Sequence, residues 1–137
     1  MMGIVHAEIQ LSNAMDRALQ RRNQLEEQDV RKINVTALVD SGAYMMVIPD
    51  KVRLQLGLEI IGYELTELAN GQQEKVAIAE PVVVHFENRK ATVDVLVVGN
   101  EVLLGAIPME AMDVIINPRL QKLTVNPEHP TTPVFRI

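Results

Sequence analysis

Apolar and polar residues alternate in two stretches near the start of the chain. The alternation is imperfect over residues 4–11 and more regular over residues 33–39. A period of two is typical of a strand that buries one face, so both stretches are predicted to be strands. The polar segment between them, residues 15–28, is compatible with a short surface helix and with a long loop, and its pattern does not decide between the two.

A turn after Asp40 leads into the apolar residues 45–49, which are predicted to form another strand. The following segment, residues 50–56, is predicted to be a short helix. Asp50 is placed to cap its start and Gly57 to end it.

Hairpins dominate the middle of the chain. Two extended stretches flank Asn70 and Gly71, a dipeptide that favours a positive φ at a tight hairpin tip, and residues 74–80 form the returning stretch. Residues 82–86 are expected to pair with residues 91–98 across a short polar turn.

The last third of the chain continues with short apolar runs separated by turn residues. Residues 102–105 are apolar up to a glycine, and residues 107–112 are predicted to be a short helix with Pro108 in its first turn. Residues 114–116 and 123–125 are predicted to form a further hairpin. Many short strands with one or two short helices predict an all-β fold closed into a barrel.

The length and composition predict one domain. A chain of 137 residues that is 47% hydrophobic can bury one core and is too short for two ordinary domains. Residues 1–126 are therefore expected to form a single domain. Pro127, Pro130 and Pro133 predict that residues 127–137 form an extended C-terminal tail.

The charge and the aromatic content argue against a nucleic-acid partner. The chain has 13 Lys and Arg against 18 Asp and Glu, a formal net charge of −5. None of its 2 Tyr and 2 Phe flanks a basic cluster, so a base-stacking surface is not expected.

Several other classes are excluded by what the sequence lacks. There is no Cys, and hence no disulfide, thiolate zinc site or cysteine nucleophile. The start does not resemble a secretory signal, and the apolar runs are far shorter than the ~20 residues that a membrane helix needs. We expect a cytoplasmic protein with no membrane partner.

Candidate chemistry lies where an apolar strand runs into polar turn residues. Residues 37–39 lead directly into Asp40, Ser41, Gly42 and Ala43. By themselves, an Asp, a Ser and a Gly describe an ordinary turn at the end of a strand, because all three suit turn backbones. Asp40 is nevertheless the one aspartate that is followed by a hydroxyl residue and a glycine.

The run from Val39 to Ala43 resembles the active-site turn of the retropepsin-like (clan AA) aspartic proteases, and later segments match that family in order. Residues 47–49 look like the strand after the catalytic loop, and residues 56–57 look like the end of the helix that follows. The closing hairpin, with residues 115–118 and 123–125, is similar to that of prokaryotic single-domain members.

Two further elements of the family are recognisable. Asn70 and Gly71 resemble the tip of the flap that covers the active site. Leu103, Leu104 and Gly105 resemble the element of two apolar residues and a glycine that threads behind the catalytic loop.

The resemblance implies a retropepsin-like barrel in which Asp40 is catalytic and Ser41, Gly42 and Ala43 support the active-site loop. Two close carboxylates share one proton, so that one accepts a proton from water while the other donates to the substrate carbonyl. A single chain supplies one such Asp, and an identical chain related by a two-fold axis supplies the other. The expected assembly is therefore a homodimer.

Two positions depart from the family pattern. Position 41 is Ser where Thr is usual, which keeps the hydroxyl that braces the two loops across the dimer. Tyr44 stands where a small polar or acidic residue is usual, which puts contacts of that side chain to a substrate backbone in doubt.

The expected function is a homodimeric aspartic endopeptidase that acts on an extended peptide or protein without a cofactor. The alternative is a catalytically inactive dimerisation or peptide-binding module of the same fold, and a weaker one is a structural β-domain whose Asp-Ser-Gly is only a turn. No metal is assigned, because His6, His85 and His129 have no spacing typical of a metal site.

Overall fold

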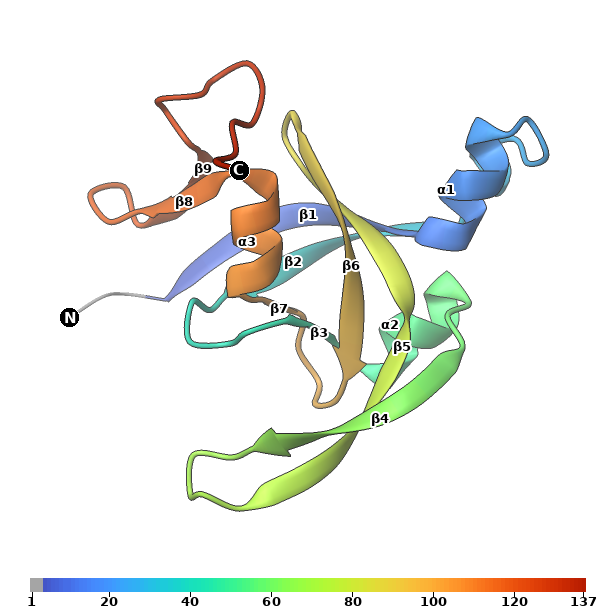
Figure 1. Cartoon of the computed structure of the whole chain (residues 1–137), viewed down its shortest axis with the longest axis horizontal. Coiled ribbons are helices and arrows are strands. Elements are labelled where there is room, and N and C mark those ends of the chain that lie inside the picture. The colour runs from blue at the N-terminus through green and yellow to red at the C-terminus, as the bar shows by residue number, and fades with distance from the viewer. Residues whose placement is uncertain (1–3) are drawn as a thin grey trace.

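The computed structural model describes residues 4–137, so residues 1–3 of the predicted domain lie outside the described part (Figure 1). Its strands are β1 Val5–Asn13, β2 Lys32–Val39, β3 Met46–Ile48, β4 Ile60–Glu67, β5 Gln73–Phe86, β6 Arg89–Val97, β7 Leu103–Leu104, β8 Val114–Asn117 and β9 Lys122–Val125. Its helices are α1 Ala14–Arg21, the 3-10 helix η1 Glu27–Asp29, α2 Asp50–Leu56 and α3 Ala106–Met112. The prediction of a mainly β chain is confirmed, with three α-helices instead of one or two.

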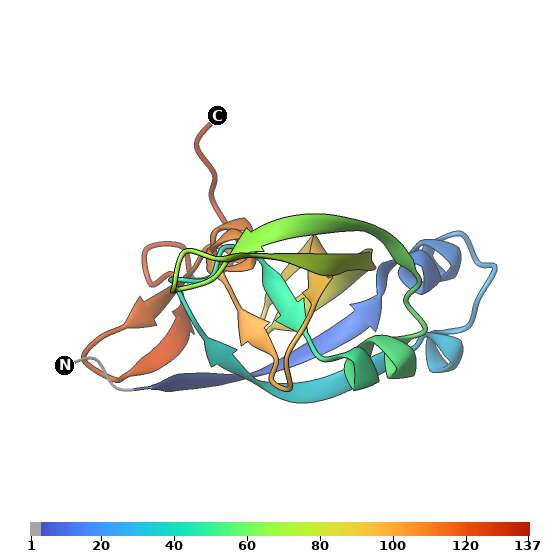
Figure 2. The same ribbon diagram turned by 90° about the horizontal axis from the view of Figure 1, so that it is seen from below.

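Seven strands form one sheet in the order β1-β2-β7-β3-β6-β5-β4, and β8 and β9 pair separately. The β2–β7 and β3–β6 pairs are parallel, and the other pairs are antiparallel. Because β5 also pairs with β1, the circuit of paired strands returns to its first member, and β4 lies outside that circuit. Figures 1 and 2 show the β4–β5 hairpin extending along one side of the molecule.

The alternation seen in the sequence explains how β1 packs. Val5, Ala7, Ile9 and Leu11 are buried. On the opposite face His6 and Glu8 are exposed and Gln10 is half-buried, and only the end of the strand is buried on both faces. The buried face joins a core drawn from β2, β3, β5, β6, α2 and α3. Burying apolar area in this way is the main force that holds such a sheet together.

The segment that the pattern left open, residues 15–28, is a helix followed by a loop. Asn13 caps α1, since its side-chain oxygen accepts the backbone N–H of Asp16 at 3.1 Å. The Asp16 carboxylate in turn accepts three hydrogen bonds from the backbone and guanidinium of Arg31, of 3.0, 2.9 and 2.9 Å. The hydrogen bond from the Arg31 side chain is the largest of the effects that lower the pKa of Asp16. This pair fixes the helix to the start of β2.

Three local predictions need correction. The N-cap of α2 is Pro49 and not Asp50, because Asp50 is already helical and its carboxylate accepts a hydrogen bond from Arg53. Gly57 ends the helix as predicted, with φ 65°. The two strands expected at 74–80 and 82–86 are one strand, β5, which continues through an irregularity in its pairing with β6. The turn between β5 and β6 is two residues long, since Phe86 pairs with Arg89.

The residues after β9 make specific contacts with the body of the protein. Asp113, which follows α3, accepts hydrogen bonds from the side chains of Asn126 and His129 and from the backbone N–H of Val134, at 3.1, 2.7 and 3.1 Å. The guanidinium of Arg89, only 1% exposed, donates to the carbonyl of His129. Residues beyond these contacts extend away from the body (Figure 2). The boundary between domain and tail at residue 126 stays a prediction.

Candidate active site

The Asp40 turn sits directly at the end of β2. The backbone N–H of Gly42 donates to Asp40 Oδ1 at 2.9 Å, and the N–H of Ala43 donates to the Asp40 carbonyl at 3.1 Å. Asp40 is half-buried, whereas Ser41 and Gly42 are exposed. The carboxylate is therefore held by its own turn, with one side left open to a partner or a substrate.

The segment around Leu104 lies directly behind this turn. The N–H of Leu38 donates to the carbonyl of Val102 at 2.8 Å, and the N–H of Asp40 donates to the carbonyl of Leu104 at 3.0 Å. These are the bonds of the parallel β2–β7 pair. They prevent the end of β2 from shifting and so fix where the Asp40 side chain starts.

Gly105 permits the closest approach of the two segments. A Cβ at this position would lie 2.3 Å from the Met45 carbonyl oxygen and 2.8 Å from that of Ala43. Both distances are far below a real contact, and both atoms belong to the backbone, so only glycine fits without moving the turn. Immediately after it, Ala106 donates to the Ala43 carbonyl at 2.9 Å, which joins the start of α3 to the same loop.

Gly42 is restricted less severely. A Cβ there would lie 3.2 Å from Asp40 Oδ1 and would press on the carboxylate itself. A side chain at position 42 would therefore press on the same oxygen that accepts the backbone N–H of Gly42.

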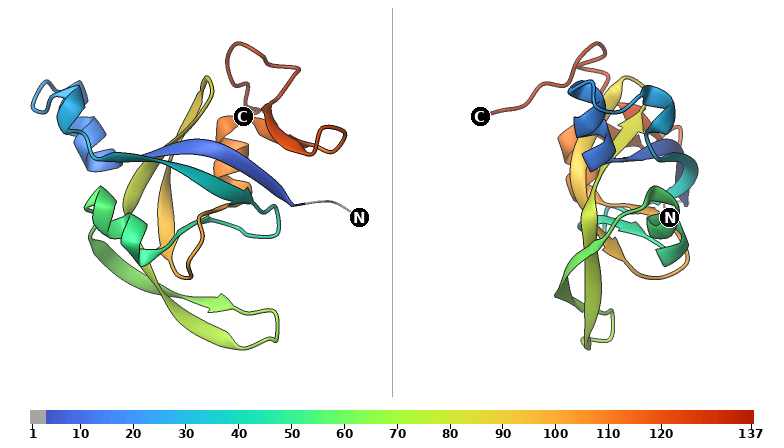
Figure 3. Two further views of the ribbon diagram at one scale, coloured as in Figure 1. Left: turned by 180° about the vertical axis from the view of Figure 1, so that it is seen from behind. Right: turned by 90° about the vertical axis from the view of Figure 1, so that its right-hand side faces the viewer.

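The predicted flap is the β4–β5 hairpin. Its turn spans residues 68–72 and is wider than the tight tip expected: the N–H of Leu68 donates to Gln72 O at 2.7 Å, and that of Gly71 donates to Leu68 O at 2.9 Å. Gly71 has φ 83°, and the Asn70 side chain accepts the N–H of Gln72 at 3.0 Å. Figures 1 and 3 show this turn on the same side of the molecule as the loop after β2.

A cleft of about 440 Å³ lies between the Asp40 loop and the hairpin. It is lined by residues 42–45 and Val47, by residues 64–67 of β4, and by Leu96 and Val98. The size and mostly apolar lining are typical of a ligand site. Tyr44 stands in this cleft with 73% of its surface exposed.

The fold thus brings together residues that the sequence singled out separately. The Asp40 loop, the Leu103–Gly105 element and the hairpin with Asn70 and Gly71 all surround or support one cleft. Sequence reasoning missed the walls contributed by Glu64, Leu96 and Val98, because nothing in a strand pattern says which loop a strand will face. Within residues 4–137, no group of three or more His, Asp or Glu could hold a metal ion.

No protein-family model matches the chain, and no curated protein sequence matches it. Among solved structures, it is similar to the retroviral protease-like domain of Ddi1 from Leishmania major, at 13% identity and TM-score 0.52, over 91% of each chain. It is also similar to a retropepsin-like aspartic protease from Rickettsia conorii, at 14% identity and TM-score 0.45, over 85% of this chain and 90% of the other. The simian foamy virus (mac) protease matches at 15% identity and TM-score 0.47, over 76% of this chain and 90% of the other.

The similarity to the Leishmania domain shows the fold of the chain. The chain has the retropepsin-like fold, as the resemblance around Asp40 predicted, and the likeness to the Leishmania domain extends over nearly the whole of both chains. No helix within residues 4–137 is long and apolar enough to cross a membrane.

Proposed function

We propose that the protein is a homodimeric aspartic endopeptidase in which Asp40 and its counterpart in the partner subunit activate a water molecule. The observation that carries the proposal is the placement of Asp40. It follows directly after β2, its backbone N–H is bonded to the carbonyl of Leu104, and its loop borders the cleft between that loop and the β4–β5 hairpin. One chain contributes one such carboxylate, and the mechanism needs two. A two-fold axis through the cleft provides the second.

In this mechanism, the paired carboxylates hold one proton between them. The ionised member takes a proton from water as the water attacks the peptide carbonyl, and the protonated member donates to the carbonyl oxygen. The hairpin closes over an extended substrate and excludes bulk water. Ser41 supports the loop through its hydroxyl, and Ala43 keeps the cleft wall small.

The proposal includes the closed barrel, a cytoplasmic location and a peptide or protein substrate. The return of the strand pairings from β5 to β1 supports closure of the barrel. A catalytically inactive peptide-binding module remains the second candidate, and the observation that favours it is Tyr44, a large and mostly exposed residue that lines the cleft next to the Asp40 turn.

The deciding experiment compares wild type with Asp40→Asn on an unstructured peptide library, across acidic to neutral pH. Asn is nearly isosteric and keeps the turn, yet it neither takes nor shares a proton. We expect the variant to lose on the order of 10²-fold or more in peptide hydrolysis while its circular dichroism is unchanged.

The matched control is Asp29→Asn, because the Asp29 side chain makes no hydrogen bond within residues 4–137 and lines no part of the cleft. It should cut peptides like wild type. Equal activity in Asp40→Asn would place the chemistry elsewhere. A dimeric wild type that binds peptides and cuts none at any pH would favour the binding module.

A further inference from the structure

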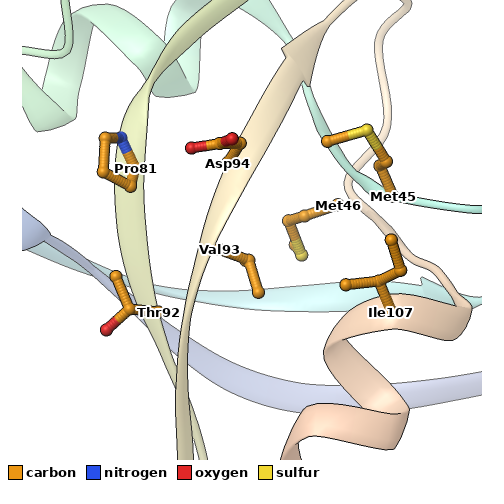
Figure 4. Close-up of a pocket in the computed structure, with 7 residues that line it drawn as sticks. All are labelled: Met45, Met46, Pro81, Thr92, Val93, Asp94 and Ile107. Carbon is orange, nitrogen blue, oxygen red and sulfur yellow. The ribbon is translucent and has the colours of Figure 1, made fainter.

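A second cavity, of about 360 Å³, lies beside the cleft, and Met45 lines both. The rest of its lining comes from β3, β5, β6 and α3. Figure 4 shows these side chains: Met46, Pro81, Thr92, Val93, Asp94 and Ile107. None of them has a part in the proposed chemistry.

The pairing of β5 with β6 explains why the sheet is open here. Two residues of β5, Glu80 and Pro81, lie opposite the single residue Asp94 of β6, which is the arrangement of a β-bulge. Pro81 has no N–H to donate to the ladder. The bulge leaves Asp94 without a cross-strand partner at the rim of the cavity.

The carboxylate of Asp94 is exposed and makes no hydrogen bond or ion pair within the described residues 4–137. No Lys, Arg or His lines this cavity. Asp16 and Asp50, by contrast, pair with Arg31 and Arg53. Asp94 therefore leaves uncompensated negative charge over an apolar hollow.

We propose that this cavity is an accessory subsite that binds the side chain of a lysine or arginine in the substrate. The aliphatic stem would pack on Met45, Pro81 and Ile107, and the cationic head would pair with Asp94. An apolar side chain would cover the carboxylate without pairing it, and an acidic one would be repelled. The inference rests on the proposed function in one respect: the lysine or arginine belongs to a peptide substrate that is bound in the adjoining cleft.

The test uses peptides that carry Lys, Gln or Glu in turn at each position on either side of the bond that is cut. We expect one defined position at which kcat/KM falls in the order Lys, Gln, Glu, with Lys favoured over Gln on the order of threefold, the size typical of one exposed ion pair. Added salt should reduce the preference, because exposed charges are screened.

Asp94→Asn should remove the preference for Lys over Gln in kcat/KM at that position, and Asp94→Lys should change the preference to Glu. The control is Glu110→Gln, a change of the same kind at an exposed residue of α3 that lines neither cavity; it should keep the wild-type ratio. A preference for Lys that survives both Asp94 variants overturns the subsite.

A binding measurement separates this proposal from the protease proposal. Fluorescence anisotropy of labelled Lys and Gln peptides on Asp40→Asn, and on Asp40→Asn combined with Asp94→Asn, reports the preference without cleavage. Cleavage with no Lys preference overturns the subsite alone. Binding that prefers Lys and depends on Asp94, without cleavage by wild type, supports the subsite and contradicts the protease. Equal binding of the two peptides overturns the subsite whatever the activity.

Discussion

Two glycines near Asp40 differ in how strongly the structure restricts them. Gly105 faces two backbone oxygens that cannot move without shifting the Asp40 loop, whereas Gly42 faces only the Asp40 carboxylate at its contact limit. The geometry of the Asp40 turn thus depends on a residue that lies 65 positions after Asp40 in the sequence.

Gly105→Ala should destabilise the fold by about 3 kcal/mol, the upper end of what overpacking costs, because its methyl group would collide with the carbonyls of Met45 and Ala43. Urea denaturation would measure the loss. The matched control is Gly62→Ala in β4, where a methyl group meets nothing within 4 Å. We expect that control to stay within about 0.5 kcal/mol of wild type. Equal stability of both variants would contradict the close packing at Gly105.

At the level of secondary-structure elements, the β4–β5 hairpin is partly buried on β5 and mostly exposed on β4. Val76 of β5 is only 4% exposed, whereas most of β4 is exposed along its length. An element with few buried side chains opens more easily than the core, which suits a lid.

Gly71→Val should slow turnover more than it affects folding. The glycine has φ 83°, a region that costs a residue with a side chain roughly 1–2 kcal/mol, so the turn would shift to other conformations and close less well. We expect kcat/KM to fall on the order of tenfold with little change in Tm. Ala69→Val adds similar bulk to the same turn without a positive φ and serves as the control. Unchanged kinetics in Gly71→Val would show that the hairpin is not the lid.

The segment after β9 is attached to the body by Asp113. The backbone N–H of Val134, followed by the side chain of Asn126 and then His129, lowers the pKa of Asp113 from 3.8 to about 2. Because the folded pKa lies below the unfolded one, the carboxylate stabilises the fold above about pH 4, and this contribution disappears as the pH falls through about 2.

Asp113→Asn should therefore be less stable than wild type at neutral pH, and the difference should shrink between about pH 4 and pH 2. Thermal unfolding at a series of pH values would measure it. The control is Asp29→Asn, which removes a carboxylate without hydrogen bonds in the described residues and should leave the stability at neutral pH close to that of wild type. A gap for Asp113→Asn that persists unchanged at pH 2 would contradict the assigned hydrogen bonds.

At the scale of the whole molecule, a monomer presents half of the proposed site. Wild type mixed with an excess of Asp40→Asn should form heterodimers with one carboxylate. If subunits exchange freely and total protein is held constant, the total activity should fall with the square of the wild-type fraction. The reason is that only dimers of two wild-type chains carry a pair of aspartates. Mixing with Glu110→Gln instead should leave activity unchanged.

Sedimentation over a concentration series provides the companion measurement for the dimer. Specific activity should rise with the fraction of dimer. A linear dependence of activity on the wild-type fraction, or cleavage by a strictly monomeric species, would contradict a site shared between subunits.

Most of the local structure follows from short-range patterns in the sequence. The alternation over residues 33–39 predicts β2, and the same pattern places the strand's end at Asp40. Gly57 and Pro108 mark where α2 ends and α3 starts. Each of these signals is local, because backbone preferences and the period of buried positions depend on neighbouring residues alone.

Other features depend on contacts between distant parts of the chain. The bulge opposite Asp94 reflects how β5 has to pair on both sides, and neither strand's pattern contains it. Glu64 and Leu96 face the Asp40 loop only because the circuit of strands brings β4 and β6 around it. The attachment of residues 126–134 likewise depends on Asp113 and Arg89 lying within reach. Such contacts join residues far apart in the chain, and they form only when the packing of the whole core fixes which surfaces meet.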